Sequence, residues 1–258
     1  MIRTSDEYRD SIKDGREVWI NGEKVDDPTV HPQMKPIIDV RARIYDMQHD
    51  PKTQAAMTYE ENGERHAIGM RLPHEAKDWK DKRDAVDLVM HDVGGIVTRV
   101  GDETIGEMWS LRDGKDILNE IDPRFAQNIE RHIQTCTKED PFHVSANTDP
   151  KGDRSKAPQD QDPDMLVHVV KEADAGIIIR GAKYETAAAY SNQALLKPTI
   201  ANWGNSEMSD YALGCIVKMN APGVKHICPT GAQVRHLLKN YVDDLYRFFC
   251  SRSVVDLA

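Results

Sequence analysis

The sequence predicts an α+β protein, because helical patterns fill the first half of the chain and strand-like runs fill the second. Apolar residues recur at helical spacing in several segments up to Cys136. Short runs rich in Val, Ile and Leu, separated by turn residues, begin at Leu166. Near the end, Val234–Phe249 again places apolar residues at the spacing of an amphipathic helix. A helical block followed by a strand block is typical of α+β folds or of two subdomains.

The composition indicates a soluble, globular, cytoplasmic protein. Its 258 residues suffice for one large domain or two smaller ones. The net charge of −9, without a basic block, argues against nucleic acids and anionic membranes as partners. No apolar run is long enough to span a bilayer, and the N-terminus lacks a signal-peptide core. The four scattered cysteines form no Cys-x-x-Cys pair, so we expect neither a metal site nor disulfides.

Local signals define the first elements. Thr4 and Glu7 have the spacing of a capping box, and Gly15 is a plausible end for the first helix. Two short strand-like runs, Val18–Ile20 and Glu23–Val25, then flank an Asn-Gly pair. This pair favours the tight turn of a β-hairpin, so we expect a hairpin here.

Four more helices are predicted between His31 and Cys136. His31-Pro32 opens the first, the second covers Glu75–Val93, and Asp122-Pro123 supplies an N-cap and a first-turn proline for the last. Their expected buried faces, in chain order, are Ile37, Val40, Ile44 and Met47; Trp79, Val86, Met90 and Val93; Ile105, Met108 and Leu111; and Phe125, Ile129, Ile133 and Cys136.

Beyond the helices, we expect a long loop and then strands. Residues 139–164 are rich in Asp, Pro, Lys and Gln and show no periodicity. The expected strands are Leu166–Val170 and Ile177–Arg180 around the turn Asp174–Gly176, followed by Ala194–Ala201, Tyr211–Met219 and, after the turn Ala221–Gly223, Val224–Cys228.

One segment of the loop has side chains that could bind a ligand. Asn147–Arg154 combines an Asp-Pro turn with Lys151 and Arg154, which could meet a phosphate while turn amides offer donors. A solvated charged loop is the alternative interpretation. The sequence has no Gly-x-Gly-x-x-Gly, Walker, Gly-x-Ser-x-Gly or His-Glu-x-x-His signature. His132, beside an apolar helix face, is expected to be structural.

An ordered set of short motifs provides a more specific signal. The motifs are Ser5–Tyr8, Asp14–Trp19, Gly22–Val25, Thr29–Pro32, Tyr45-Asp46, His49–Pro51, Thr148–Arg154, Gly176–Lys183, Lys197–Thr199, Asp210–Ala212 and Ala221–Gly223. Together, over residues 1–228, they resemble the 4-hydroxyphenylacetate 3-hydroxylase family of two-component flavin monooxygenases. The related 4-hydroxybutyryl-CoA dehydratase shares the Thr-Asp-Pro-Lys-Gly-Asp-Arg segment.

This resemblance implies an acyl-CoA-dehydrogenase-like fold. A helical N-terminal domain would cover residues 1–143, a β-barrel-like domain 144–228, and a divergent amphipathic helix 229–258. The family continues into a C-terminal helical bundle, whereas the resemblance stops near Cys228, so we expect that bundle to be missing. The implied activity is FADH2-dependent hydroxylation of a phenolic or aromatic substrate with O2, with FAD delivered by a separate flavin reductase. An exposed face would favour a homo-oligomer.

The resemblance also assigns residues. The flavin loop falls on Thr148, Lys151, Gly152, Asp153 and Arg154, and extends to Pro158. A second wall for flavin and substrate falls near Ala187, Thr199 and Ile200. Arg99 matches an arginine that orients the substrate, Glu103 stands where the hydroxylases have a tyrosine, and Ser145 stands at the position of a histidine, two residues from His143.

The two replacements leave alternatives open. An acid at Glu103 would repel a phenolate unless it is protonated. One alternative is therefore a non-catalytic fragment or interaction module of the same fold. Another is a CoA-ester dehydratase or isomerase, although that branch holds an iron–sulfur cluster with cysteines at the positions of Arg99 and Glu103.

Overall fold

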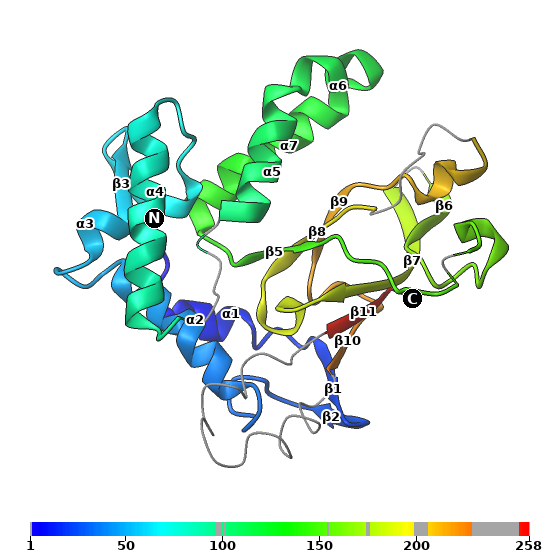
Figure 1. The fold of residues 1–258 in the computed structure, drawn as a ribbon, viewed down its shortest axis with the longest axis horizontal. Helices are drawn as coiled ribbons and strands as arrows, with labels where there is room; N and C mark the ends of the chain where they lie inside the picture. Colours follow the sequence, from blue (N-terminus) through cyan, green and yellow to red (C-terminus); the bar gives the residue numbers. More distant parts are fainter. Residues whose placement is uncertain are drawn as a thin grey trace. The chain divides into compact units, whose positions relative to one another are not determined.

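The chain divides into two compact units. The computed structural model describes residues 2–95, 100, 102–153, 155–173, 176–198, 206–228 and 253–257 (Figure 1). Unit 1 comprises Met1–Ser11 and Pro36–His143, and unit 2 comprises Ile12–Lys35 and Val144–Ala258. The described part is therefore a mixed helix-and-sheet structure whose N-terminal segment contributes to both units.

Unit 1 is mainly helical. Its elements are α1 (Ser5–Ser11), α2 (Lys35–Met47), α3 (Gln54–Met57), the hairpin of β3 (Thr58–Glu61) and β4 (Glu64–Ala67), η1 (Ile68–Met70), α4 (Ala76–Asp92), α5 (Asp102–Asp113), α6 (Lys115–Ile121) and α7 (Pro123–Glu139). None of the helices in the described residues is long and apolar enough to cross a membrane.

The predicted helix caps are confirmed. The Thr4 N–H donates to Glu7 Oε2 at 2.7 Å, and the Glu7 N–H donates to Thr4 Oγ1 at 3.2 Å, which is the reciprocal pattern of a capping box. At the start of α7, the Asp122 carboxylate accepts from the Arg124 N–H at 2.8 Å, and Pro123 occupies the first turn. Both caps supply acceptors for amides that have no partner inside the helix.

Two helix predictions need correction. Helix α2 begins at Lys35, because the His31 carbonyl accepts from both the Met34 and Lys35 amides in a turn that precedes the helix. On α4 the predicted face was wrong at Trp79, which is 62% exposed, although Val93 does pack against the core. The buried residues of the helix are Asp78, Lys82, Ala85 and Val89. Asp78 accepts hydrogen bonds from the His74 and Glu75 amides just before the helix and pairs with Arg71 at 2.5 Å. Helix α6 and the β3–β4 hairpin were not predicted.

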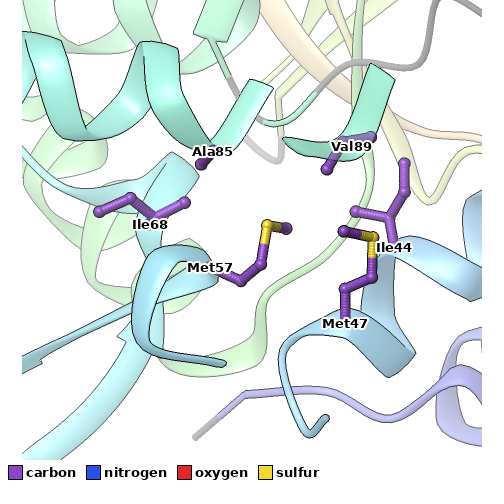
Figure 2. Packing of buried hydrophobic residues seen from close by; sticks show 6 residues of the cluster. All are labelled: Ile44, Met47, Met57, Ile68, Ala85 and Val89. Carbon is purple, nitrogen blue, oxygen red and sulfur yellow. The ribbon is translucent and has the colours of Figure 1, made fainter. Parts of the chain in front are cut away.

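The core of unit 1 forms where α2, α3, η1 and α4 converge. Its buried side chains are Ile44, Met47, Met57, Ile68, Ala85 and Val89 (Figure 2). The apolar face predicted for α2 is thus confirmed at Ile44 and Met47. The unbranched side chains of Met47 and Met57 can fill irregular gaps in this cluster. This packing fixes α2, which carries Arg41 of the unit 1 cavity described below.

Unit 2 contains the two larger sheets. Its strands are β1 (Glu17–Ile20), β2 (Glu23–Val25), β5 (His143–Ala146, which begins at the boundary), β6 (His168–Ala173), β7 (Gly176–Glu185), β8 (Gln193–Leu196), β9 (Cys215–Lys218), β10 (Val224–Cys228) and β11 (Ser253–Leu257). One sheet has the order β2-β1-β10-β11-β7-β6, and another has the order β5-β8-β9.

The N-terminal hairpin is confirmed and joins a sheet built from the far end of the chain. Asn21 and Gly22 have φ values of 52° and 82°, as a two-residue turn between right-twisted strands requires. Strand β1 pairs in parallel with β10, from Glu17 opposite Lys225 to Ile20 opposite Cys228. Within the described residues the six-stranded sheet keeps two edges, β2 and β6, so the expected barrel-like domain is not a closed barrel.

The strand predictions were correct in order and less accurate in extent. Strand β5 lies within the segment predicted to be loop, and all four of its residues are buried. Tyr211, expected in a strand, instead ends a 3₁₀-helix, η4 (Ser206–Tyr211). Asp174 and Ala175 of the predicted β6–β7 turn lie outside the described residues. Apolar periodicity could not reveal β5, because its His and Ser interrupt the pattern.

The end of the chain differs from the prediction. The amphipathic helix expected over Val234–Phe249 lies outside the described residues. Ser253–Leu257, expected to belong to a helical segment, is the strand β11 between β7 and β10. Its Ser-Val-Val sequence is compatible with a strand, since β-branched residues favour the extended backbone.

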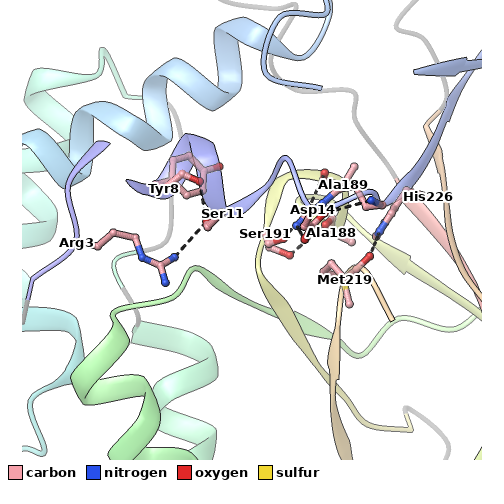
Figure 3. A network of polar contacts seen from close by, with 10 residues as sticks. Arg3, Tyr8, Ser11, Asp14, Ala188, Ala189, Ser191, Met219 and His226 are labelled. Atoms are coloured by element: carbon pink, nitrogen blue, oxygen red, sulfur yellow. Dashed lines mark hydrogen bonds and ion pairs between the residues drawn. The ribbon is translucent and has the colours of Figure 1, made fainter. Parts of the chain in front are cut away.

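A buried arginine ties the N-terminal segment of unit 2 to a distant loop. Arg16 binds both oxygens of Asp14, at 2.8 and 2.7 Å, and donates to the carbonyls of Ala189 and Ser191, at 3.1 and 2.6 Å. Figure 3 shows Asp14, Ala189 and Ser191 gathered at this point, with His226 and Met219 beside them. The planar guanidinium group of Arg16 suits this combination of a carboxylate and two carbonyls.

Candidate functional site

The predicted flavin loop is an exposed turn anchored at its start. The Tyr184 N–H of β7 donates to the Thr148 carbonyl at 2.8 Å, which fixes the point where the loop leaves the sheet. Thr148, Lys151, Gly152 and Asp153 are then exposed. Arg154 lies outside the described residues. The described part of the loop therefore presents hydroxyl, ammonium and amide groups to solvent.

Gly152 sits at the tightest point of this turn. Its φ is +45°, and a Cβ there would lie 2.4 Å from Met165 Cε and 2.5 Å from Gln161 Oε1. Gln161 holds the turn, because its Oε1 accepts from the Asp153 N–H at 2.7 Å. A side chain at position 152 would displace this clamp and also strain the backbone.

Asp153 shapes the loop through its carboxylate. Its Oδ1 accepts from Ser155 Oγ at 2.7 Å and from the Ser155 N–H at 3.0 Å. These hydrogen bonds lower the pKa of Asp153, so the carboxylate is ionised at neutral pH. An ionised Asp153 points to a conformational role, whereas the exposed ammonium of Lys151 suits an anion.

Behind the loop lies a buried ion pair that sequence reasoning did not assign. The Lys183 ammonium of β7, with its side chain 2% exposed, contacts Asp149 Oδ1 and donates to the Lys197 carbonyl at 2.8 Å. Burial lowers the pKa of Lys183, and Asp149 opposes that shift. The pair borders a small cavity lined by Asp149, Leu166, Val167, Lys183, Leu196, Lys197, Pro198, Tyr211 and Leu213.

A sequence signal for Lys183 existed. The inward positions of β7 are Gly181, Lys183 and Glu185, so a lysine falls on the buried side of an alternating strand. A lysine at such a position needs a partner or has a function. The identity of that partner, Asp149, depends on how the loop folds back over the sheet.

The other predicted wall residues are only partly described. Ala187 is buried, and its N–H donates to Glu185 Oε1 at 3.2 Å. Pro158 is half-buried and opens the short helix η2 (Pro158–Asp160). Pro198 borders the cavity, whereas the substrate residues Thr199 and Ile200 lie outside the described residues. Their placement toward a substrate therefore stays a prediction.

The predicted catalytic residues fall in different parts of the chain. Arg99 lies outside the described residues, and Glu103 occupies the first turn of α5. Ser145, on β5, is fully buried. Whether these three residues act on a substrate stays a prediction.

A second cavity lies within unit 1 beside Val100, the neighbour of Arg99. It is lined by Arg41, Ile44, Gln48, Met57, Ala67, Ile68, Gly69, Met70, Val100, Asp140, Pro141, Phe142 and His143. The buried Arg41 guanidinium stacks over the ring of Phe142, 4.2 Å from its centroid. Burial raises the pKa of Asp140, an effect that Arg41 opposes. This cavity thus combines apolar walls with a buried cation and a carboxyl group.

His143 meets His132 and Cys136 within unit 1. Burial, with help from His132 and Arg41, lowers the pKa of His143 to about 3, and burial also lowers the pKa of His132. Both imidazoles are therefore neutral at pH 7. From the sequence, His132 was expected to be a lone structural residue, and the spacing of the three residues matched no known motif.

Comparison with known proteins identifies the fold class. The oxygenase component of 4-hydroxyphenylacetate 3-monooxygenase, solved with FAD, matches 99% of this chain with a TM-score of 0.82 and 28% identity. A 4-hydroxybutyryl-CoA dehydratase from N. maritimus matches 100% of the chain with a TM-score of 0.84 and 25% identity. The chain therefore has the acyl-CoA-dehydrogenase-like fold predicted from its motifs.

The family is equally clear. The family model described as 4-hydroxyphenylacetate 3-hydroxylase N terminal matches residues 4–248, and the chain belongs to this family. The oxygenase component of 4-hydroxyphenylacetate 3-monooxygenase from Thermus thermophilus is 31% identical over 230 residues, 88% of this chain and 47% of the relative. The chain thus spans about half the length of its relatives, and the match extends beyond Cys228, where the motif resemblance ended.

Proposed function

We propose that this chain forms the flavin- and substrate-binding N-terminal part of a two-component aromatic monooxygenase. The observation that carries the proposal is the family match over residues 4–248, with relatives that are oxygenase components. The partner would be a flavin reductase that supplies FADH2, the substrate a phenolic small molecule, and the assembly a homo-oligomer. FAD, when bound, supplies the oxygen chemistry, and the protein binds and orients both molecules.

The residues of the loop fit a flavin nucleotide. Thr148 and Lys151 expose a hydroxyl and an ammonium group, which suit a phosphate or a ring oxygen. Gly152 lets the Gln161 and Met165 side chains close against the backbone of the turn, which keeps the shape of the loop. The buried pair of Lys183 and Asp149 holds the base of the loop, which reduces the ordering cost on binding.

For the substrate we propose Arg99, Glu103, Ser145, Thr199 and Ile200. Arg99 would orient the substrate by its fixed positive charge. Glu103 would have to be protonated, or hydrogen-bonded to the phenol OH, to be compatible with a phenolic ligand. Ser145 would offer a hydroxyl in place of an imidazole, which makes a weaker base.

The first test is an anaerobic calorimetric titration of the chain with reduced FAD. We expect binding in the micromolar range, weakened at least about tenfold by Gly152→Ala, which is about 1.4 kcal/mol. Gly63→Ala is the matched control, because Gly63 also has a positive φ (+78°) but no atom within 4 Å of its virtual Cβ. Absence of FADH2 binding by the folded wild-type chain would refute the proposal.

Turnover distinguishes an enzyme from an interaction module. With reductase, O2 and a panel of phenols, the proposal predicts a hydroxylated product and loss of that product in Arg99→Met. Flavin binding without turnover for any phenol would leave the non-catalytic module as the better description.

A CoA-ester enzyme is the second candidate, favoured by the similarity to the archaeal dehydratase and by the shared segment Thr148–Arg154. Arg99 and Glu103 stand where the resemblance places cluster-binding cysteines in that branch, which weighs against it. It predicts acyl-CoA binding to the purified chain. Calorimetry that detects FADH2 binding but no acyl-CoA binding would eliminate it.

A further inference from the structure

Three side chains of unit 1 come together at the end of α7. His132 and Cys136 are four residues apart on that helix, so they share one face. His143 lies on β5, after the chain has turned at Asp140. One donor atom from each of the three lies within 4.8 Å of the other two, and two of the three residues are buried.

The turn that places His143 is itself held firmly. Asp140, the C-cap of α7, adopts the left-handed conformation with φ 46° and ψ 51°. Tyr45 donates to its carbonyl at 3.1 Å, and the Gln48 side chain donates to its carboxylate at 3.0 Å. The position of His143 relative to α7 is therefore set by neighbouring side chains, as in sites that must keep a fixed geometry.

The distances suit a single metal ion. Zinc lies about 2.3 Å from a thiolate and about 2.0–2.1 Å from an imidazole, so tetrahedral ligands are about 3.4–3.6 Å apart. Cys136 Sγ and His132 Nε2 are already 3.2 Å apart. The widest donor separation, at most 4.8 Å, would have to close by about 1.4 Å, which side-chain rotation can supply.

The space beside the cluster resembles an open coordination position. A small cavity touches His132 and Cys136 and is otherwise lined by Met70, Ile105, Met108, Trp109, Ile133 and Thr137. The Trp109 Nε1–H on its wall is buried and finds no acceptor among the described residues. A buried donor without an acceptor is costly, and a water molecule on a metal ion in this cavity would accept its hydrogen bond.

We propose that His132, Cys136 and His143 form a binding site for a Zn²⁺-class divalent metal ion, with water as the fourth ligand. Two imidazoles and one thiolate select zinc and its neighbours over Mg²⁺ or Ca²⁺, which prefer oxygen ligands. On binding, the Cys136 thiol loses its proton to the solvent, and the sulfur–metal bond replaces the hydrogen bond to His132. Three protein ligands and a water are the coordination of catalytic rather than structural zinc sites.

The test uses the full chain without flavin, so its result is independent of the proposed function. The chain is stripped with a chelator and titrated anaerobically with Co²⁺, a spectroscopic substitute for Zn²⁺. We expect tetrahedral d–d bands and a thiolate-to-cobalt charge-transfer band that saturate at one equivalent and disappear when Zn²⁺ is added. Cys136→Ser should abolish the charge-transfer band and weaken metal binding by about 100-fold or more, beyond the loss typical of a second-shell change.

Controls separate a site from adventitious metal. Cys215→Ser, which changes a half-buried cysteine of unit 2, should bind Co²⁺ like the wild type. His132→Asn provides a second ligand variant if Cys136→Ser does not fold, as judged by circular dichroism. X-ray absorption of the zinc-loaded wild type should give one sulfur and two imidazole nitrogens. No charge-transfer band in the wild type, or equal binding by folded ligand variants, would overturn the proposal and leave a packed thiol–imidazole cluster.

Discussion

Replacing Lys183 by methionine tests whether the ion pair under the flavin loop is a coupled buried pair. The substitution keeps the length of the side chain and removes its charge. It removes the ammonium that contacts the Asp149 carboxylate, which is only 11% exposed, and it removes the hydrogen bond that Lys183 donates to the Lys197 carbonyl. Removing one partner of a buried pair typically costs about 3–5 kcal/mol. Because Asp149 keeps some access to water, we expect about 3 kcal/mol.

The reciprocal change is milder. Asp149→Asn keeps an oxygen that can accept from the ammonium, and the Lys197 carbonyl still accepts at 2.8 Å, so we expect about 2 kcal/mol. The double variant Lys183→Met/Asp149→Asn leaves no uncompensated charge. It should therefore cost about 3 kcal/mol rather than the sum of about 5, which corresponds to a coupling energy of about 2 kcal/mol.

Urea unfolding followed by circular dichroism measures these energies, and hydrogen exchange in β7 peptides assigns them to unit 2. Lys171→Met on β6 is the control, because Lys171 is exposed and surface changes usually stay within about 0.5 kcal/mol. If the double variant equals the sum of the single variants, or if Lys183→Met behaves like Lys171→Met, the pair is not coupled and this reasoning is wrong.

Three further predictions concern local structure. Arg16→Lys should lower the free energy of unfolding by about 2 kcal/mol in urea denaturation, because an ammonium cannot reproduce the fork that binds Asp14 and two carbonyls; an unchanged midpoint would contradict this. Asp122→Ala should cost about 1 kcal/mol and Asp122→Asn much less, since asparagine also caps helices; equal thermal melting of both variants would argue against the cap. Burial lowers the pKa of His226 to about 4, so the unfolded state binds a proton at higher pH than the folded state. The free energy of unfolding should therefore fall by up to about 3 kcal/mol as the pH drops from about 6.5 to 4. His226→Gln should remove this part of the pH dependence. His91→Gln is the control, because His91 is exposed.

Features set by neighbouring residues were predictable from the sequence. The capping box of Thr4 and Glu7, the Asn21-Gly22 turn and the Asp122 cap all depend on side chains that reach their own local backbone. The motif set from Ser5 to Gly223 identified the family, because ordered short matches are specific even where each one is weak.

Features set by distant residues were not predictable. The buried face of α4 was misassigned, since Asp78 turns inward to bind two amides while Trp79 stays exposed. Strand β5 was missed, because a buried His and Ser in place of apolar residues hide the strand pattern. The Asp78 contacts are local, with amides three and four residues earlier, and apolar periodicity does not detect such a cap. The buried His143 of β5, in contrast, meets His132 only in the folded unit.

The sequence by itself thus determined the general order of helices before strands, several caps and turns, and the family, because these depend on local chemistry and on motifs read along the chain. The tertiary structure alone decided that β1 pairs with β10 across some two hundred residues, that Lys183 finds Asp149, and that His132, Cys136 and His143 meet. The physical reason is that such contacts form between segments far apart in sequence, whose mutual placement results from the packing of the whole unit rather than from local preference.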